Sequence, residues 1–65
     1  MWSVHYRIDD IPGLRVLRTR ELAIESACHL LDNGVDVRKI LRVGTLEEID
    51  LTKIMTLWVE RKGGI

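Results

Sequence analysis

The chain has 65 residues, of which 46% are hydrophobic and 31% are charged, and 10 basic residues balance 10 acidic ones. This composition is typical of a folded globular protein, and the length allows one domain, residues 1–65. A formal net charge of zero excludes a strong overall attraction to nucleic acid or to an anionic membrane.

Cys28 is the only cysteine, so the chain cannot form an internal disulfide. A structural zinc site needs about four ligands, and the soft candidates are only Cys28, His5 and His29. We therefore expect neither a metal nor another cofactor. The lone cysteine, the lack of an export signal after Met1 and the lack of a long apolar run predict a cytoplasmic protein without membrane attachment. Because a core of this size supplies about 3–5 kcal/mol, we expect a homodimer.

The chain begins with an alternating segment, residues 2–9. One face of this segment is apolar and the other is polar: Trp2, Val4, Tyr6 and Ile8 against Ser3, His5, Arg7 and Asp9. This period of two predicts a half-buried strand. Residues 9–13, which include Pro12 and Gly13, predict a turn, and residues 14–18 predict a second short strand. The connection is too short for a crossover, so we expect an antiparallel hairpin.

Residues 19–34 have the pattern of a capped helix. Thr19 is a favourable N-cap residue, and Gly34, after Asn33, is a favourable left-handed C-cap residue. Between them, apolar residues recur every three or four positions: Ala23, Ile24, Ala27, Cys28, Leu30 and Leu31. This stripe predicts a helix that ends near Asp32 and packs one side on the sheet.

The segment from Val35 to Val43 predicts a third strand with an irregularity. Four apolar residues share one face: Val35, Val37, Leu41 and Val43. Lys39 falls on the same face, so we expect either a β-bulge near Lys39 or an edge strand whose inward lysine blocks further pairing. Residues 46–49 are a candidate fourth strand, and the pattern leaves their pairing open.

A second helix follows Asp50, which is a favourable N-cap residue. Its apolar positions have the spacing of a helix whose apolar stripe faces the core: Leu51, Ile54, Met55, Leu57, Trp58 and Val59. Gly63-Gly64 is predicted to end this helix. Trp2 and Trp58 are interpreted as core or dimer anchors, each near an edge of the core because the indole N–H needs a partner.

These elements predict an α+β domain with the order β-β-α-β-(β)-α. We expect two layers, a small antiparallel sheet with both helices on one face. The other face of the sheet is then left to solvent or to a partner.

The outward face of the sheet is the main candidate binding surface. The predicted register places five basic residues on it, with Leu17 and Ile40 among them: His5, Arg7, Arg15, Arg38 and Arg42. Guanidinium groups suit phosphate and carboxylate because they offer a planar fork of donors. The face is therefore a candidate nucleic-acid, phosphate or protein-binding surface, and an ordinary solvated face is the alternative. It lacks the interleaved aromatic residues that stack bases in single-strand binders.

Cys28 and His29 are the other candidates for chemistry. A thiol nucleophile needs a base within hydrogen-bond reach, whereas Cys28 falls on the apolar stripe of the first helix, which favours a small buried residue. His29 has Glu25 and Asp32 on the same helix face, which predicts a surface ion pair. The sequence contains no phosphate loop, dinucleotide fingerprint, nucleophile elbow or metal motif, and we predict no catalytic residue.

Several segments resemble a group of short bacterial proteins of no known function. The resemblance covers most of the chain and lies in residues 2–8, Thr19 with Ala23-Ile24, residues 27–34, Val37 with Ile40, and the helix near Trp58. It implies a bacterial cytoplasmic α+β domain. It implies no activity, so no functional residue is carried over.

Three hypotheses about function follow from the sequence. The first is a dimeric, non-enzymatic interaction module that engages a partner through its sheet or a helix face. The second is nucleic-acid or phosphate binding through the basic outward face. The third is a small enzyme, or an accessory subunit of one, and only Cys28 and His29 support this hypothesis.

Overall fold

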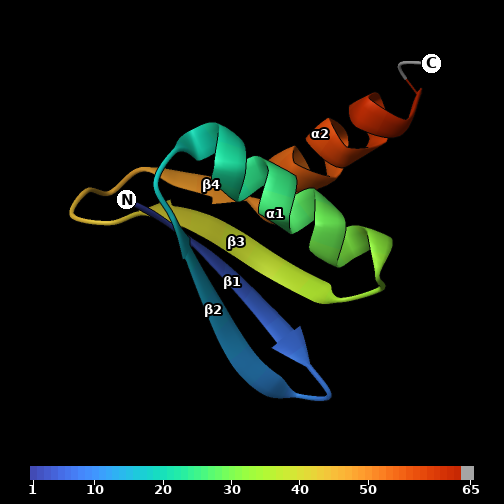
Figure 1. Cartoon of the computed structure of the whole chain (residues 1–65), viewed down its shortest axis with the longest axis horizontal. Helices are drawn as coiled ribbons and strands as arrows, with labels where there is room; N and C mark the ends of the chain where they lie inside the picture. The colour runs from blue at the N-terminus through green and yellow to red at the C-terminus, as the bar shows by residue number, and fades with distance from the viewer. Residues whose placement is uncertain (64–65) are drawn as a thin grey trace.

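The computed structural model describes residues 1–63 and has the predicted α+β architecture. Its elements are β1 (Trp2–Ile8), β2 (Ile11–Leu17), α1 (Arg20–Asp32), β3 (Asp36–Arg42), β4 (Glu48–Asp50) and α2 (Leu51–Gly63). The sheet has the order β2-β1-β3-β4, and every neighbouring pair is antiparallel. Both helices pack on one face of this sheet (Figure 1), so the predicted fold class and element order are confirmed.

The β1–β2 hairpin has a tighter turn than the sequence predicted. Asp9 and Asp10 both adopt left-handed backbone angles, with φ of 52° and 67°, as a two-residue type I′ turn requires. Strand β2 therefore begins at Ile11 rather than at residue 14. Pro12 is compatible with this edge strand because it lies opposite Arg7 in a non-hydrogen-bonded pair, where its missing N–H would point away from the sheet.

Gly13 makes room for an aromatic ring. It lies directly opposite Tyr6, and a Cβ atom at position 13 would overlap the Tyr6 ring. The ring therefore lies across the backbone of β2, where a larger residue would displace it. The tip of the hairpin extends beyond both helices (Figure 1), which leaves Ile8 and Ile11 exposed.

The core lies between α1 and the middle of the sheet. Ala23 and Ala27 are fully buried, and their small side chains let α1 approach the strands closely. The largest fully buried side chains come from three different elements: Ile40, Ile54, Val4 and Val37. The helix stripe predicted from residues 23–31 is confirmed, with Leu31 only partly buried.

A β-bulge in β3 changes which residues of that strand face the helices. His5 pairs with Lys39 and Tyr6 pairs with Val37, so Arg38 is the extra residue. The bulge predicted near Lys39 is therefore confirmed. The edge-strand alternative is wrong, because β3 lies between β1 and β4.

The bulge also corrects the predicted faces of β3. Ile40 lies opposite Val4 and is fully buried, although the unbroken alternation placed it outward. Leu41, predicted to face the core, lies on the open face opposite Ser3, and Val43 is exposed. One extra residue reverses the alternation, because successive side chains point to opposite faces of a strand.

The predicted caps of α1 are confirmed. Thr19 Oγ1 accepts a hydrogen bond from the Leu22 amide at 3.1 Å. At the other end, Gly34 has a φ of 75°, and its amide donates to the Leu31 carbonyl at 3.0 Å. The Val35 amide donates to the Leu30 carbonyl at 2.9 Å, which completes a Schellman motif.

The fourth strand and the second helix also form, with shifted boundaries. Residues 48–50 pair with β3, whereas Leu46, which belonged to the predicted strand, is fully exposed in the preceding loop. Asp50 Oδ1 accepts a hydrogen bond from the Lys53 amide at 2.9 Å, as expected of an N-cap. Gly63 is the last helical residue, and Gly64 lies outside the described residues.

Candidate functional site

The five predicted basic residues do not share one face of the sheet. His5 and Arg7 lie on the open face, whereas Arg15 lies opposite the buried Val4 and therefore on the helix side. Arg42 lies opposite Trp2, again on the helix side. The predicted common face is wrong for two reasons. The two-residue turn places Arg15 rather than its neighbours on the helix side of β2, and the bulge moves the residues of β3 that follow it to the opposite face of the sheet.

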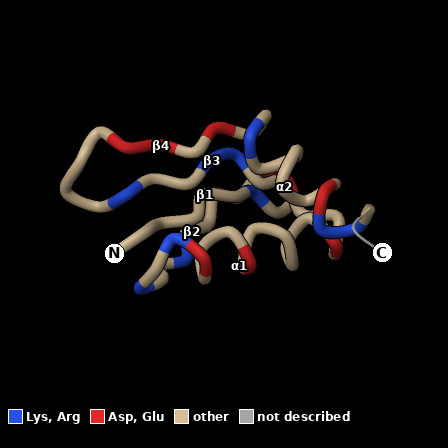
Figure 2. Tube along the Cα trace, turned by 90° about the horizontal axis from the view of Figure 1, so that it is seen from above, with Lys and Arg blue, Asp and Glu red and all other residues tan. Residues whose placement is uncertain are grey.

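The arginines instead take part in separate local contacts. The Arg15 guanidinium lies 6.0 Å from the centre of the Tyr6 ring, and that of Arg42 lies 5.7 Å from the Trp2 ring. Arg38 and Arg42 also form exposed ion pairs, with carboxylate distances of 3.2 Å to Asp36 and 3.4 Å to Glu47. Figure 2 shows basic positions interleaved with acidic ones along the trace.

The five residues named by the nucleic-acid hypothesis therefore do not form one basic surface. Of the five residues that it named, His5 and Arg7 remain together on the open face, and Arg38 lies at the bulge, where it pairs with Asp36. Phosphate binding by any of them stays an untested prediction.

The open sheet face carries a Ser–His contact that the sequence reasoning missed. Ser3 Oγ lies 3.2 Å from His5 Nε2 and donates to the Leu41 carbonyl at 3.3 Å. Ser3 is buried, and its hydroxyl lies within hydrogen-bond distance of both the imidazole and a backbone carbonyl. A serine nucleophile also needs a third group that orients its base, and within residues 1–63 no side chain other than Ser3 hydrogen-bonds to His5, so we interpret this contact as structural. Alternation on the polar face of residues 2–9 was the available signal, since Ser3 and His5 are two residues apart.

Cys28 is buried in the core side of α1, as its place on the apolar stripe predicted. Burial raises the pKa of its thiol, an effect that the nearby Arg61 guanidinium partly offsets. A raised pKa keeps the thiol protonated, which makes it a weak nucleophile. His29 is exposed and lies 3.8 Å from Glu25, in the predicted surface pair. These positions give the enzyme hypothesis no supporting geometry.

Asp32, at the end of α1, forms polar contacts with the second half of α2. Trp58 Nε1 donates to Asp32 Oδ1 at 2.8 Å, and Lys62 Nζ lies 3.2 Å from the same oxygen. Lys62 also lies 4.3 Å from the centre of the Trp58 ring. The hydrogen bond from Trp58, followed by that from Lys62, lowers the pKa of the Asp32 carboxyl. The predicted N–H partner of Trp58 is therefore present, and it fixes which side of α2 faces outward.

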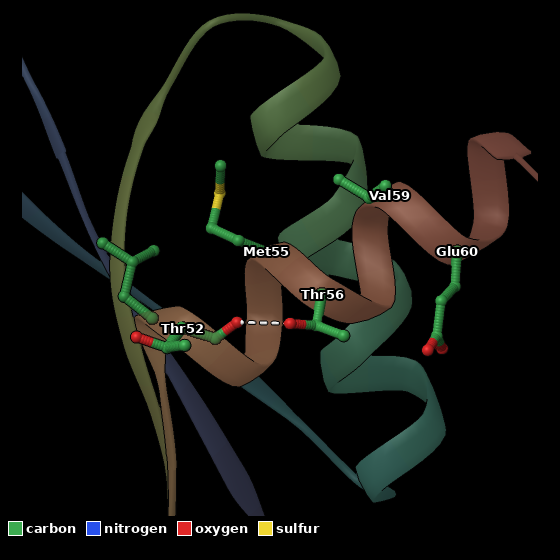
Figure 3. A pocket seen from close by; sticks show the side chains of 6 residues that line it. Thr52, Met55, Thr56, Val59 and Glu60 are labelled. Carbon is green, nitrogen blue, oxygen red and sulfur yellow. Dashed lines mark hydrogen bonds between the residues drawn. The ribbon is translucent and has the colours of Figure 1, made fainter.

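The other side of α2 is an uncovered apolar surface. Leu51, Met55 and Val59, at intervals of four residues, are 38%, 38% and 59% exposed. With three polar neighbours they line an open groove of about 600 Å³, shown in Figure 3: Leu51, Thr52, Met55, Thr56, Val59 and Glu60. We call these six residues the α2 outer face.

The α2 outer face corrects the prediction that the whole apolar stripe of this helix belongs to the core. Ile54 alone is fully buried, and Leu57 and Trp58 are partly buried. Helix α2 contacts β3, β4 and α1 from one side, whereas the stripe is wider than that contact. The sequence signal for these residues was visible, but periodicity does not say what covers them.

Comparisons with known protein families, with curated proteins and with solved structures find no match for this chain. Within residues 1–63, no cluster of three or more His, Cys, Asp or Glu side chains could hold a metal ion. In the same part of the chain, no helix combines the length and the apolar character that crossing a membrane requires. Function is therefore inferred from the two uncovered surfaces, the open sheet face and the α2 outer face.

Proposed function

We propose that this protein is a non-enzymatic interaction module that associates with a second copy of itself through the α2 outer face. The observation that carries the proposal is the exposed row formed by Leu51, Met55 and Val59. Contiguous apolar surface of this kind gains free energy when another apolar surface removes it from water. A helix presenting residues at i, i+4 and i+8 is suited to pack along another helix.

We take a second copy as the occupant, because the charge of the chain does not oppose self-association. The formal net charge is zero, so two copies approach without overall repulsion. In a twofold dimer the same patch lies on both sides of the interface, and each apolar row covers the other. A small domain with a limited core also gains stability from such a subunit contact.

The α2 outer face is better suited to this contact than the open sheet face. Leu14 and Val16 are exposed near the β2 edge of the sheet, but Ser3, His5 and Lys39 occupy its centre. On α2, by contrast, the Thr56 hydroxyl already donates to the Thr52 carbonyl at 3.0 Å (Figure 3). Covering this side of the helix therefore leaves the Thr56 hydroxyl hydrogen-bonded, which avoids the cost of burying an unsatisfied polar group.

The dimer is expected to be weak. Stable interfaces use roughly 20–30 residues a side, whereas six residues line the α2 groove. We therefore expect a dissociation constant on the order of 10–100 μM. Both species are then populated over a range that sedimentation covers.

Sedimentation equilibrium of the wild type and three lysine variants tests the proposal. Met55→Lys places a charge in the middle of the α2 outer face, and we expect it to remain monomeric at concentrations up to about 500 μM. Leu46→Lys, in the exposed loop before β4, and Leu14→Lys, on the open sheet face, are matched controls expected to dimerise like the wild type. Circular dichroism verifies that each variant is folded.

Two outcomes would overturn the proposal. One is a wild type that stays monomeric up to about 500 μM, well above the expected dissociation constant. The other is a dimer that Leu14→Lys abolishes and Met55→Lys leaves intact, which would assign the contact to the open sheet face.

A further inference from the structure

We infer that the two α2 helices run antiparallel in the dimer, with Lys53 of each copy beside Glu60 of the partner subunit. This arrangement rests on the proposed self-association. It adds the orientation of the two helices and the charge pairs that select it.

Lys53 and Glu60 lie on the same flank of α2. They are seven residues apart, which is close to two full turns of a helix. Both side chains are exposed, and neither takes part in an ion pair within residues 1–63. They border the α2 outer face, of which Glu60 is the last residue. A charge of each sign is therefore available at opposite ends of one edge of the α2 outer face, with Thr52 and Thr56 between this edge and the apolar row.

Antiparallel packing about a twofold axis brings these flanks together. Such an axis places the flank of one helix beside the same flank of the other with the direction reversed. Lys53 then lies level with the partner's Glu60, and Glu60 lies level with the partner's Lys53. Parallel packing about a twofold axis would instead place this charged flank beside the apolar row of the partner subunit, which is unfavourable because the charges lose water without gaining an opposite charge.

The same register brings apolar side chains into contact. The twofold axis that aligns the two charge pairs passes between residues 56 and 57. Met55 then lies beside Val59 of the partner subunit, and the two threonine positions 56 meet near the axis. One arrangement therefore brings the apolar rows into contact and pairs the opposite charges. Helix pairs select their register and orientation by combining contacts of these two kinds.

Charge reversal at either position leaves the helix itself intact. Lys53 is the third residue of α2, where an acidic side chain interacts favourably with the helix dipole. Glu60 lies in the last turn beside Arg61 and Lys62, where a basic side chain is favourable. Lys53→Glu and Glu60→Lys are therefore expected to fold as well as the wild type, so that a change in dimerisation reports the interface.

The test measures the dimer dissociation constant of the wild type, Lys53→Glu, Glu60→Lys and the double variant. Each single change converts two attractive pairs into two repulsive ones and is expected to weaken the dimer about tenfold. The double variant restores opposite charges and is expected to return to within about twofold of the wild type. At about 1 M salt the difference between single variants and wild type should shrink, because exposed charges are screened. Glu48→Lys, on the open sheet face, is the control for added positive charge and should leave the constant unchanged.

Failure of this arrangement is distinguishable from failure of the proposed function. Unchanged constants in both single variants, with Met55→Lys still monomeric, would overturn the antiparallel pairing and leave self-association through α2 in place. A double variant as weak as the single ones would overturn the pairing as well. A wild type that does not dimerise would remove both proposals.

Discussion

Helices α1 and α2 have the same length but differ in how much of their apolar side the chain covers. Each has 13 residues and an oxygen-bearing N-cap side chain. Helix α1 buries five residues, whereas α2 buries Ile54 alone. The comparison shows that helical periodicity identifies the apolar side of a helix without saying whether the same chain covers it.

The positions of the two helices account for this difference. Helix α1 crosses β1, β2 and β3, and its alanines let the backbone lie close to the sheet. Helix α2 follows the short strand β4 and extends past the end of the sheet, with its C-terminal end away from the strands (Figure 1). Its larger apolar side chains therefore project on both sides of a narrow contact, and one side remains uncovered.

The largest expected effect comes from truncating neighbouring residues of α2. Ile54→Ala removes a fully buried side chain and should lower the free energy of unfolding by about 3 kcal/mol. Met55→Ala should cost under about 1 kcal/mol in the monomer, because Met55 is exposed. Urea denaturation at concentrations below the dimer dissociation constant measures both.

Ile54→Val keeps that comparison usable if the alanine variant does not fold, with an expected loss of about 1 kcal/mol. A loss at Met55 as large as that at Ile54 would show that both sides of α2 are packed within one chain. The distinction between the two helices would then disappear.

Removing the N-cap side chains should have smaller effects on stability, and the region in which amide protection falls should differ between the two helices. Thr19→Ala should lower the free energy of unfolding by about 1 kcal/mol, and because α1 covers the sheet, amide protection should fall throughout the strands. Asp50→Ala removes a similar hydrogen bond but should reduce protection mainly in α2, which can open without exposing the centre of the core. Hydrogen exchange followed by NMR separates global from local opening. A uniform loss in both variants would contradict the difference between the helices.

The features that the sequence predicted well depend on neighbouring residues. Thr19, Gly34 and Asp50 satisfy backbone groups within a few positions, so their roles follow from local chemistry. The buried stripe of α1 likewise follows from its period. These signals were sufficient for the element order and the two-layer architecture, because each amphipathic element has only one side that it can bury.

The features that the sequence did not predict depend on contacts between elements. The turn at Asp9-Asp10 lacks the glycine that usually marks a two-residue hairpin turn. The sequence therefore predicts that Arg15 faces outward, whereas the observed pairing places it on the helix side. The bulge at Arg38 was expected only as one of two alternatives, and its effect on Ile40 depends on pairing with β1. A basic face built from three strands exists only if the outward-facing residues of all three strands are predicted correctly. This explains why the predicted basic face is wrong although the predicted fold is confirmed.

The smallest expected effect concerns the contact that joins the two helices. The Asp32 carboxylate is stabilised by Trp58 and then by Lys62, so its pKa lies below the ordinary value. A group whose pKa is lowered by folding contributes stability above its unfolded pKa of about 4, and this contribution is lost as the pH falls through the folded value. Asp32→Asn should therefore be slightly less stable than the wild type at pH 7, and the difference should vanish in the acid range.

Urea midpoints of both proteins between about pH 7 and pH 2.5 measure this difference, and the indole N–H resonance of Trp58 reports the contact directly. Asp36→Asn, which alters a separate exposed ion pair with Arg38, is the control for removing a carboxylate. A gap between Asp32→Asn and wild type that stays constant with pH would show that the charge of Asp32 does not hold α2. The outward direction of the α2 outer face would then be set by Ile54 and its neighbours in the core alone.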